Sequence, residues 1–179
     1  MKKILSLTLA FMLLLTACGG KSDANTPKDG KSLADVLSEV ESEFCEKFGV
    51  EQMLVMPTDI DTQYLSDMVG LSADDIEESA GQIALTMTNS DAFFAVKAKN
   101  EKTEAVTEAF SSYLKSLVAQ YERYSVCNSY ERAQAGRVYV KGDYVFFIVV
   151  GMTPDDDEST EIYPEQVQFV MDCIDSKFN

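Results

Sequence analysis

Residues 137–150, RVYVKGDYVFFIVV, predict a β-hairpin at the centre of a sheet. Gly142 and Asp143 form a turn pair between two runs rich in β-branched and aromatic residues. In the first run Val138 and Val140 alternate with other side chains, which is typical of a half-exposed strand. The second run, YVFFIVV, is apolar at every position. We therefore expect it to be a central strand that is buried on both faces.

A second hairpin is predicted upstream of the first. Its strands are residues 82–88, QIALTMT, and residues 92–98, AFFAVKA. Asn89, Ser90 and Asp91 lie between them and supply turn-forming side chains. Because short turns join neighbouring strands antiparallel, the two hairpins predict four antiparallel strands.

Apolar residues at helical spacing predict three main helices, at residues 33–48, 101–124 and 164–178. The first follows Ser32, a good N-cap residue, and the last carries Pro164 in its first turn. Three shorter helices are also expected, at residues 61–69, just after Ser72, and at residues 129–135. Ser72 and Asp75 resemble a capping pair at the start of the second of these helices.

These elements predict an α+β fold: an antiparallel four-stranded sheet of two hairpins, with helices packed on one face. Residues 50–60, VEQMLVMPTDI, are either a further strand or merely a packed segment, because Pro57 interrupts them. The apolar stripe of the long helix contains Tyr113, Tyr121 and Tyr124. That stripe is a core-packing face or a binding face, and its regular spacing favours packing.

Residues 1–17 have the pattern of a secretory leader. Lys2 and Lys3 precede an apolar run that is shorter than the roughly 20 residues of a transmembrane helix. The run ends in Leu-Thr-Ala before Cys18, which resembles the bacterial lipobox, where acyl chains such as palmitate are attached to the cysteine and the leader is cut before it. The alternative is an ordinary secretory leader that happens to contain a cysteine. We expect lipidation of Cys18, because two or more acyl chains, at about 0.8 kcal/mol per buried CH₂, anchor a protein stably.

The leader divides the chain into three parts. Residues 1–17 are the predicted signal peptide, residues 18–31 a flexible tether rich in small and polar residues, and residues 32–179 a single α+β domain. The expected location is the outer face of the cell membrane, with the lipid on Cys18 as the anchor.

The chain is strongly acidic, with thirty Asp and Glu against fifteen Lys and Arg and a formal charge of −15. Loss of the two leader lysines would make it more negative still. Such a surface repels phosphate backbones, so nucleic acid is not an expected partner. The charge either keeps a tethered protein soluble and off the membrane surface, which we favour, or attracts a cationic partner.

The chain contains no histidine. This excludes Ser-His-Asp and Cys-His catalytic groups and every histidine-based zinc site. Carboxylate, Lys or Tyr chemistry stays possible, but with so many acidic residues no pair can be singled out. We therefore predict no catalytic, cofactor-binding or metal-ligating residue, and we expect a protein that is not an enzyme.

The other cysteines are Cys45, Cys127 and Cys173, an odd set once Cys18 carries lipid. They are free thiols or include one bridged pair, and we expect free thiols. The densest acidic run offers oxygen ligands of the type that Ca²⁺ takes, but it lacks an EF-hand pattern, so we expect a solvated loop. This run contains Asp155, Asp156, Asp157 and Glu158, and a second acidic patch contains Asp74, Asp75, Glu77 and Glu78.

Two long stretches carry a resemblance to a known family. They are SDAFFAVKAKNEKTEAVTEAFSSYLKSLVAQYERY, residues 90–124, and YERAQAGRVYVKGDYVFFIVV, residues 130–150. Together with the leader they resemble a family of small Firmicute lipoproteins known only as a domain of unknown function, numbered four-three-five-eight. The match is less clear from residue 153 onward. The resemblance implies an exported, membrane-anchored protein of Gram-positive type and implies no catalytic or binding residues.

The sequence thus predicts a location more firmly than an activity. The leading hypothesis is a non-enzymatic binding domain, displayed on the membrane, whose partner is an envelope protein or an extracellular ligand. The alternatives are a small-ligand capture protein that serves a transporter and a carboxylate-dependent envelope enzyme. Capture proteins of that kind usually have two lobes and about twice this length.

Overall fold

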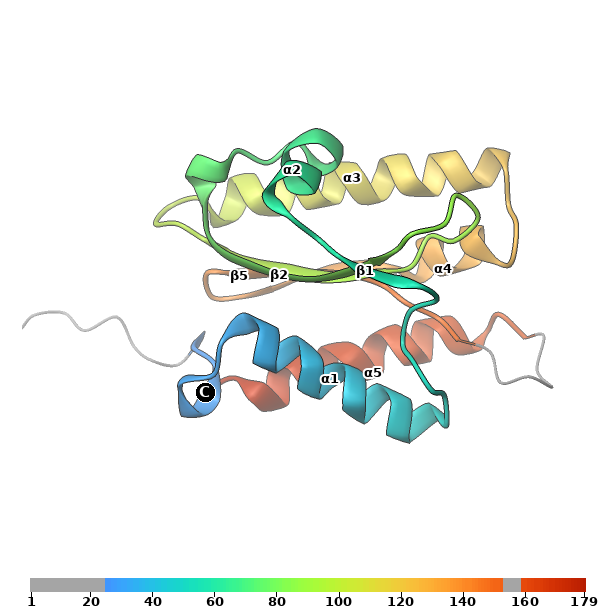
Figure 1. The fold of residues 1–179 in the computed structure, drawn as a ribbon, viewed down its shortest axis with the longest axis horizontal. Helices are drawn as coiled ribbons and strands as arrows, with labels where there is room; N and C mark the ends of the chain where they lie inside the picture. The colour runs from blue at the N-terminus through green and yellow to red at the C-terminus, as the bar shows by residue number, and fades with distance from the viewer. Residues whose placement is uncertain (1–24, 153–158) are drawn as a thin grey trace, which may run out of the picture.

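Five antiparallel strands form the centre of the molecule, between two layers of helices (Figure 1). The computed structural model describes residues 25–152 and 159–179. The spatial order is β1-β2-β3-β5-β4, so the two hairpins lie side by side through β3 and β5. The strands are β1 (Pro57–Asp59), β2 (Ile76–Ala84), β3 (Ala92–Ala98), β4 (Arg137–Lys141) and β5 (Tyr144–Val149).

The helices cover both faces of this sheet. The lower layer in Figure 1 contains α1 (Leu33–Phe48) and α5 (Ile162–Lys177), and the upper layer contains α3 (Thr103–Arg123) with the shorter α2. The helix α4 contacts both α3 and α5 and so connects the two layers. The short elements are η2 (Lys28–Gly30), α2 (Thr62–Tyr64), the π-helical turn η3 (Leu65–Val69), η4 (Ala73–Asp75) and α4 (Ser129–Ala135).

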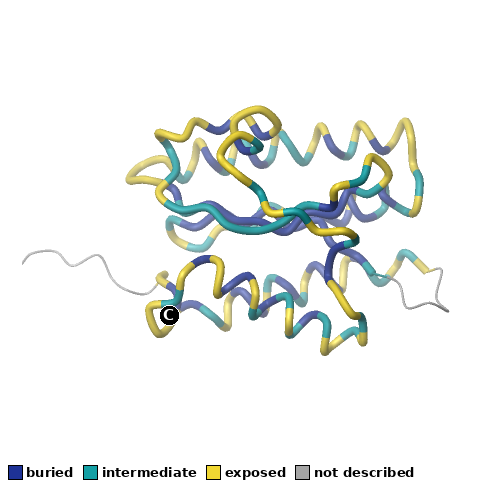
Figure 2. Tube along the Cα trace, in the orientation of Figure 1, coloured by how far each residue is buried: buried dark blue, intermediate teal, exposed yellow. Residues whose placement is uncertain are grey.

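The prediction that helices pack on one face is wrong, and the central strands show why. Alternate residues of β3 and β5 enter two separate hydrophobic clusters, with Phe93 and Phe146 facing α1 and α5. Phe94 and Phe147 face α3 on the other side. Because both faces of these strands are apolar, each face needs its own helical cover. Figure 2 shows the resulting burial along the sheet and on the helix sides that face it.

Aromatic packing holds the upper layer on the sheet. Phe94 and Phe147, on neighbouring strands, stack with ring centroids 4.8 Å apart. Phe110 of α3 meets both rings edge-on, at 5.2 and 5.8 Å. All three are fully buried, and burial of each such side chain contributes about 2–3 kcal/mol.

The α+β class is confirmed, but the sheet has five strands instead of the predicted four. The additional strand is β1, which lies within the segment left open between strand and packed segment. It has only three residues and pairs with the end of β2. A strand this short, beginning at a proline, is hard to recognise from its pattern.

The strand predicted at residues 82–88 corresponds to β2 in the structure, which begins earlier, at Ile76, and ends earlier, at Ala84. The amide of Ala84 donates to the carbonyl of Asp91, at 2.9 Å, and this bond ends the ladder. Asn89 Oδ1 accepts from the Asp91 amide, at 2.8 Å, as expected of a turn-forming side chain. The segment after Ser72 forms only the 3-10 turn η4 before β2 starts.

Gly81 in β2 allows the close approach of β3. Its φ is +126°, and a methyl group at this position would overlap the Phe94 main chain. Only glycine adopts such a conformation without strain. Gly81 thus lets β2 pair closely with β3 at Phe94, in the aromatic centre of the sheet.

The three main helix predictions are confirmed in position, and their stripes are largely buried, although Tyr124 of the predicted long-helix stripe is exposed at the end of α3. Ser32 caps α1 in a reciprocal capping box with Asp35, an arrangement worth about 1 kcal/mol. The helix ends at Gly49, which adopts the left-handed conformation. The predicted stripe of α3 contributes Val106, Phe110, Leu117 and Tyr121 to the core.

The two ends of the described chain lie together. Pro27 forms a β-bridge with Phe178, and the amide of Asn179 donates to the Thr26 carbonyl at 3.2 Å. The ammonium of Lys28 also donates to the Ser176 carbonyl, at 2.9 Å. The residues just before α1 therefore pack against the end of α5, at the left side of Figure 1.

Candidate binding surfaces

Two of the predicted features lie outside the described residues. These are Cys18, the expected lipidation site, and the acidic run of Asp155, Asp156, Asp157 and Glu158. No helix in the part of the chain that the structure describes is long and apolar enough to cross a membrane.

Cys45, Cys127 and Cys173 are not bridged to one another, in agreement with the expectation of free thiols. Cys173 is buried, and burial together with a hydrogen bond to Glu43 raises its thiol pKa to about 12. Burial also raises the pKa of Cys45. Because the thiolate is the reactive form, both side chains act as small packing groups at neutral pH.

The second acidic patch is engaged in structural contacts. Asp75 pairs with Lys102 at 2.8 Å, and Glu77 pairs with Lys97 at 2.6 Å. Glu78 accepts the amide of Leu33, at 2.8 Å, and so ties the start of α1 to β2. Within residues 25–152 and 159–179, no three His, Cys, Asp or Glu side chains gather as they would around a metal ion.

Part of the tyrosine stripe of α3 lines a pocket of about 180 Å³, which we call the tyrosine pocket. The hydroxyls of Tyr64 in α2 and Tyr113 in α3 lie 2.6 Å apart and share a hydrogen bond. Tyr121 donates to the Asn89 carbonyl at 2.8 Å. The stripe therefore serves core packing and also forms one wall of a cavity.

The three tyrosine hydroxyls of this pocket are neutral, and the carboxyl group of Asp91 also lines it. Burial raises the pKa of Tyr64, and the nearby Tyr113 hydroxyl raises it further. Burial likewise raises the pKa values of Tyr113 and Tyr121. Thr86 Oγ1, also at this pocket, is buried and has no hydrogen-bond partner among the described residues. A ligand or side chain that enters meets phenol and hydroxyl groups together with the carboxyl group of Asp91.

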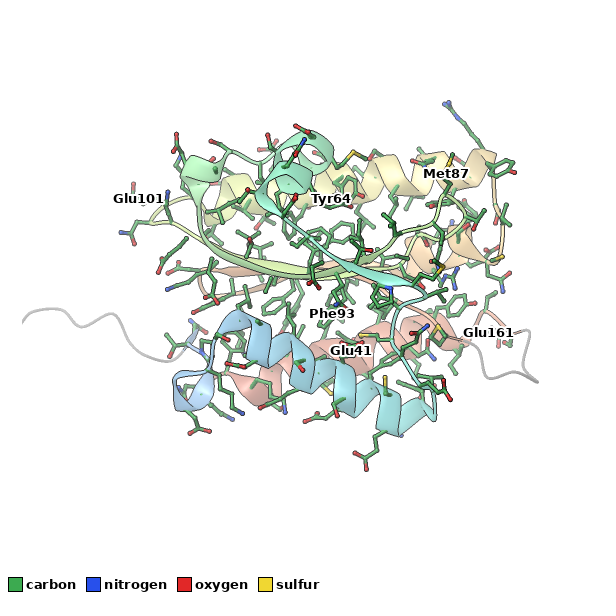
Figure 3. The ribbon with its side chains drawn as sticks, viewed as in Figure 1. Glu41, Tyr64, Met87, Phe93, Glu101 and Glu161 are labelled. Carbon is green, nitrogen blue, oxygen red and sulfur yellow. The ribbon has the colours of Figure 1, made fainter. Side chains whose placement is uncertain are left out.

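Exposed apolar side chains lie at the tyrosine pocket and on the segments next to it in the chain. Met68 and Met87 line it and are 58% and 91% exposed. Leu85, two residues before Met87, is also exposed, and its amide donates to the carbonyl of exposed Met56 at 3.2 Å. Figure 3 shows Met87 at the end of the molecule remote from the C-terminus. We call Met56, Met68, Leu85 and Met87 the methionine surface.

A buried ion pair lies where β3 begins. Asp91 and Arg132 of α4 are both almost fully buried, with Arg132 Nε 3.0 Å from Asp91 Oδ1. Arg132 also donates to the carbonyls of Cys127 and Gly151, at 2.7 and 3.2 Å. Burial raises the pKa of Asp91 to about 6, although the guanidinium opposes this. The sequence predicts only a turn-forming role for Asp91, because no local sequence pattern relates it to an arginine forty-one positions later.

A larger groove of about 560 Å³ lies between α3, α4 and the start of β4. Apolar side chains of α3, including Leu114 and Val118, face Val138 across it. Lys115, Glu122 and Arg137 provide its charges. No sequence motif marked this groove, since its residues come from three separate segments.

Comparison with protein families gives one match, to the family described as "Domain of unknown function (DUF4358)", over residues 51–150. That range is more than half of the chain. The chain belongs to the DUF4358 family. No curated protein and no solved structure matches it.

The DUF4358 match covers all five strands and the upper helical layer. It therefore contains the residues of the tyrosine pocket, the methionine surface and the Asp91–Arg132 pair. The groove beside β4 also falls within it. The helices α1 and α5, which cover the opposite face of the sheet, lie outside the matched range.

Proposed function

We propose that this DUF4358 protein is a lipid-anchored binding protein on the outer face of the cell membrane that holds a partner protein at the methionine surface. The observation that carries the proposal is the presence of exposed Met68 and Met87 at a preformed pocket, with exposed Leu85 two residues before Met87. Exposed apolar groups are costly in water unless a partner covers them.

The side-chain chemistry of the methionine surface favours a protein partner. Methionine is flexible and polarizable, so it adapts to apolar side chains of different shapes. The tyrosine pocket beside it can receive one anchoring side chain, whose polar group would find Thr86 and the tyrosine hydroxyls. The function we assign is binding without catalysis.

The membrane attachment is supported by the sequence. The leader, the lipobox-like residues before Cys18 and the resemblance to small Firmicute lipoproteins point to the same location. An acyl anchor on Cys18 would place the domain outside the cytoplasmic membrane, where envelope proteins are available as partners.

Photo-cross-linking in intact cells tests the proposed surface. A photoreactive amino acid replaces Met87 in the full chain, and in a control it replaces Glu46, which is exposed on α1. We expect a discrete cross-linked partner from position 87 and none from position 46. The substitution Met68→Ser should reduce the yield from position 87 several-fold. Equal cross-linking from both positions, or none from position 87, would contradict the proposal.

The tyrosine pocket also supports a second candidate, capture of a small ligand. Thr86 Oγ1 lacks a protein partner, and the paired hydroxyls of Tyr64 and Tyr113 can turn toward a bound molecule. A metabolite that raises the melting temperature of the native protein, but not that of Tyr113→Phe, would favour this function over protein binding.

A further inference from the structure

The outer edge of β4 carries unpaired main-chain groups. Gly142 and Asp143 join β4 to β5 in a two-residue turn, which makes Lys141 and Tyr144 a hydrogen-bonded pair. Pairing then alternates along the ladder, so the amides and carbonyls of Val138 and Val140 point away from β5. Among the described residues, no hydrogen bond reaches these groups.

The two edges of the sheet differ in how they are protected. At the opposite edge, β1 has only three residues and begins with Pro57, which lacks an amide hydrogen. Short strands and prolines are common means of blocking further pairing. In contrast, β4 runs for five residues in regular register with no proline and no bulge. It is the edge on which another strand can pair.

The groove beside β4 provides space for the side chains of an added strand. Its volume is about 560 Å³, and Val138 lies in its wall opposite Leu114 and Val118 of α3. An added strand would lie roughly 4.8 Å from β4, and its residues opposite Val138 and Val140 would project on the same face as those valines. Apolar side chains at these positions would enter the groove.

The charges along β4 select the occupant. Arg137 and Lys141 stand at its two ends, and Lys115 and Glu122 lie in the groove. Lys141 already pairs with Asp175 of α5 at 2.6 Å. The Arg137 guanidinium donates only to main-chain carbonyls, those of Ala135 and Gly136 at 2.9 and 2.7 Å among them, so of the two Arg137 is the cation without a carboxylate partner among the described residues. In an antiparallel pairing of two copies of β4, Arg137 of one copy would face Lys141 of the other, and like charges in such positions repel. Acidic residues at both ends of the added strand would instead be attracted.

From this edge, groove and charge pattern we infer that β4 binds an extended segment of a partner protein as a sixth strand. The segment has acidic residues opposite Arg137 and Lys141 and apolar residues opposite Val138 and Val140. Main-chain hydrogen bonds to the two valines provide affinity, and the groove and the basic residues provide specificity. This second surface is independent of the methionine surface.

A blocked heptapeptide, Thr-Glu-Val-Thr-Val-Glu-Thr, is the probe. Its binding to the full-length protein in detergent is followed by fluorescence anisotropy or by NMR. We expect saturable binding that weakens at least tenfold when lysine replaces both glutamates. Val138→Pro removes the outward amide without breaking the β4–β5 ladder, and Val118→Glu places a charge in the groove. Each should weaken binding at least tenfold, whereas Met87→Ser should not change it.

Two N-methylated forms of the peptide separate strand addition from simple occupation of the groove, and they leave the protein untouched. One form carries the methyl groups on the two valines and the other on the two glutamates. Alternate residues of an added strand direct their amides toward β4, so only one of the two forms should lose binding. The inference is overturned if both forms bind alike, if the lysine peptide binds as well as the glutamate peptide, or if no peptide binds at millimolar concentration.

Discussion

Asp91 shows how one residue can join distant parts of a fold at an electrostatic cost. Its carboxyl group is withdrawn from water, and Arg132 is its charged partner. Arg132 in turn holds the carbonyls of Cys127, before α4, and Gly151, after β5. The pair thus fixes the end of the sheet where three segments meet, and removal of either member would leave the other buried and unpaired.

The pKa of Asp91 predicts a characteristic pH dependence of stability. Burial raises it from 3.8 to about 6 in the folded protein. Protons therefore bind the folded state more tightly, and the associated stability is complete below pH 3.8 and is lost as pH rises through about 6. Relative to Asp91→Asn, the native protein should lose about 2 kcal/mol of unfolding free energy between pH 4 and pH 7. Urea titrations of both proteins at several pH values provide the measurement, and a pH-independent difference would contradict it.

At the scale of elements, the hydrogen bond between Tyr64 and Tyr113 connects α2 to α3 across the tyrosine pocket. Both rings also pack at 6.4 Å, nearly perpendicular. Since α2 has only three residues, its position depends on such contacts more than on its own helical hydrogen bonds.

A double-mutant cycle measures this link. Tyr64→Phe and Tyr113→Phe keep the rings and remove the hydroxyls, and each alone should destabilise the fold by about 1 kcal/mol because it leaves the other hydroxyl unpaired. The double variant should cost less than the sum, with a coupling energy of about 0.5–1.5 kcal/mol from urea denaturation. As a control, Tyr64→Phe and Glu46→Ala, whose sites share no contact in the structure, should be additive.

Periodic elements were predictable from the sequence, and elements defined by distant contacts were not. The helices α1, α3 and α5 carry regular apolar stripes, and the β4–β5 hairpin carries its own turn pair. In contrast, β1 has three residues, and β2 begins with polar residues that hide its strand character. The run YVFFIVV indicates a strand that is buried on both faces, and such a strand needs a helical layer on each face. The prediction of helices on one face did not take this consequence into account.

The residues that form the candidate surfaces were harder to predict from the sequence. The tyrosine pocket combines Tyr64, Tyr113 and Met87 from three separate elements, and only the stripe containing Tyr113 has a sequence pattern. The groove beside β4 is formed in the same way. Their residue types are ordinary for core and turn positions, so only three-dimensional proximity reveals them.

At the scale of the whole molecule, the proposed attachment site and the proposed binding surfaces occupy separate parts of the chain. The family match spans the sheet and its upper layer, where the pocket and groove lie, and begins well after Cys18. The acidic surface, with a formal charge of −15, is repelled by anionic lipids. Lipid on Cys18 would therefore supply the attraction to the membrane.

Replacement of Cys18 tests the anchor. Cys18→Ser removes the thiol that would carry the acyl chains, so the protein should move from the membrane fraction to the soluble fraction or the medium. Cys45→Ser should leave the distribution unchanged, because Cys45 packs within the folded domain. Immunoblots of fractionated cells give the readout, and a Cys18→Ser protein that stays in the membrane fraction would contradict lipid anchoring.

With lipid on Cys18, the bridge between Pro27 and Phe178 would set the height and orientation at which the domain is presented. Only six residues then lie between the anchor and Asn25, a span of at most about 25 Å. The bridged end is thereby held close to the bilayer, while Met87 lies at the opposite end of the molecule. A partner would then meet the methionine surface from above and need no room beneath the domain.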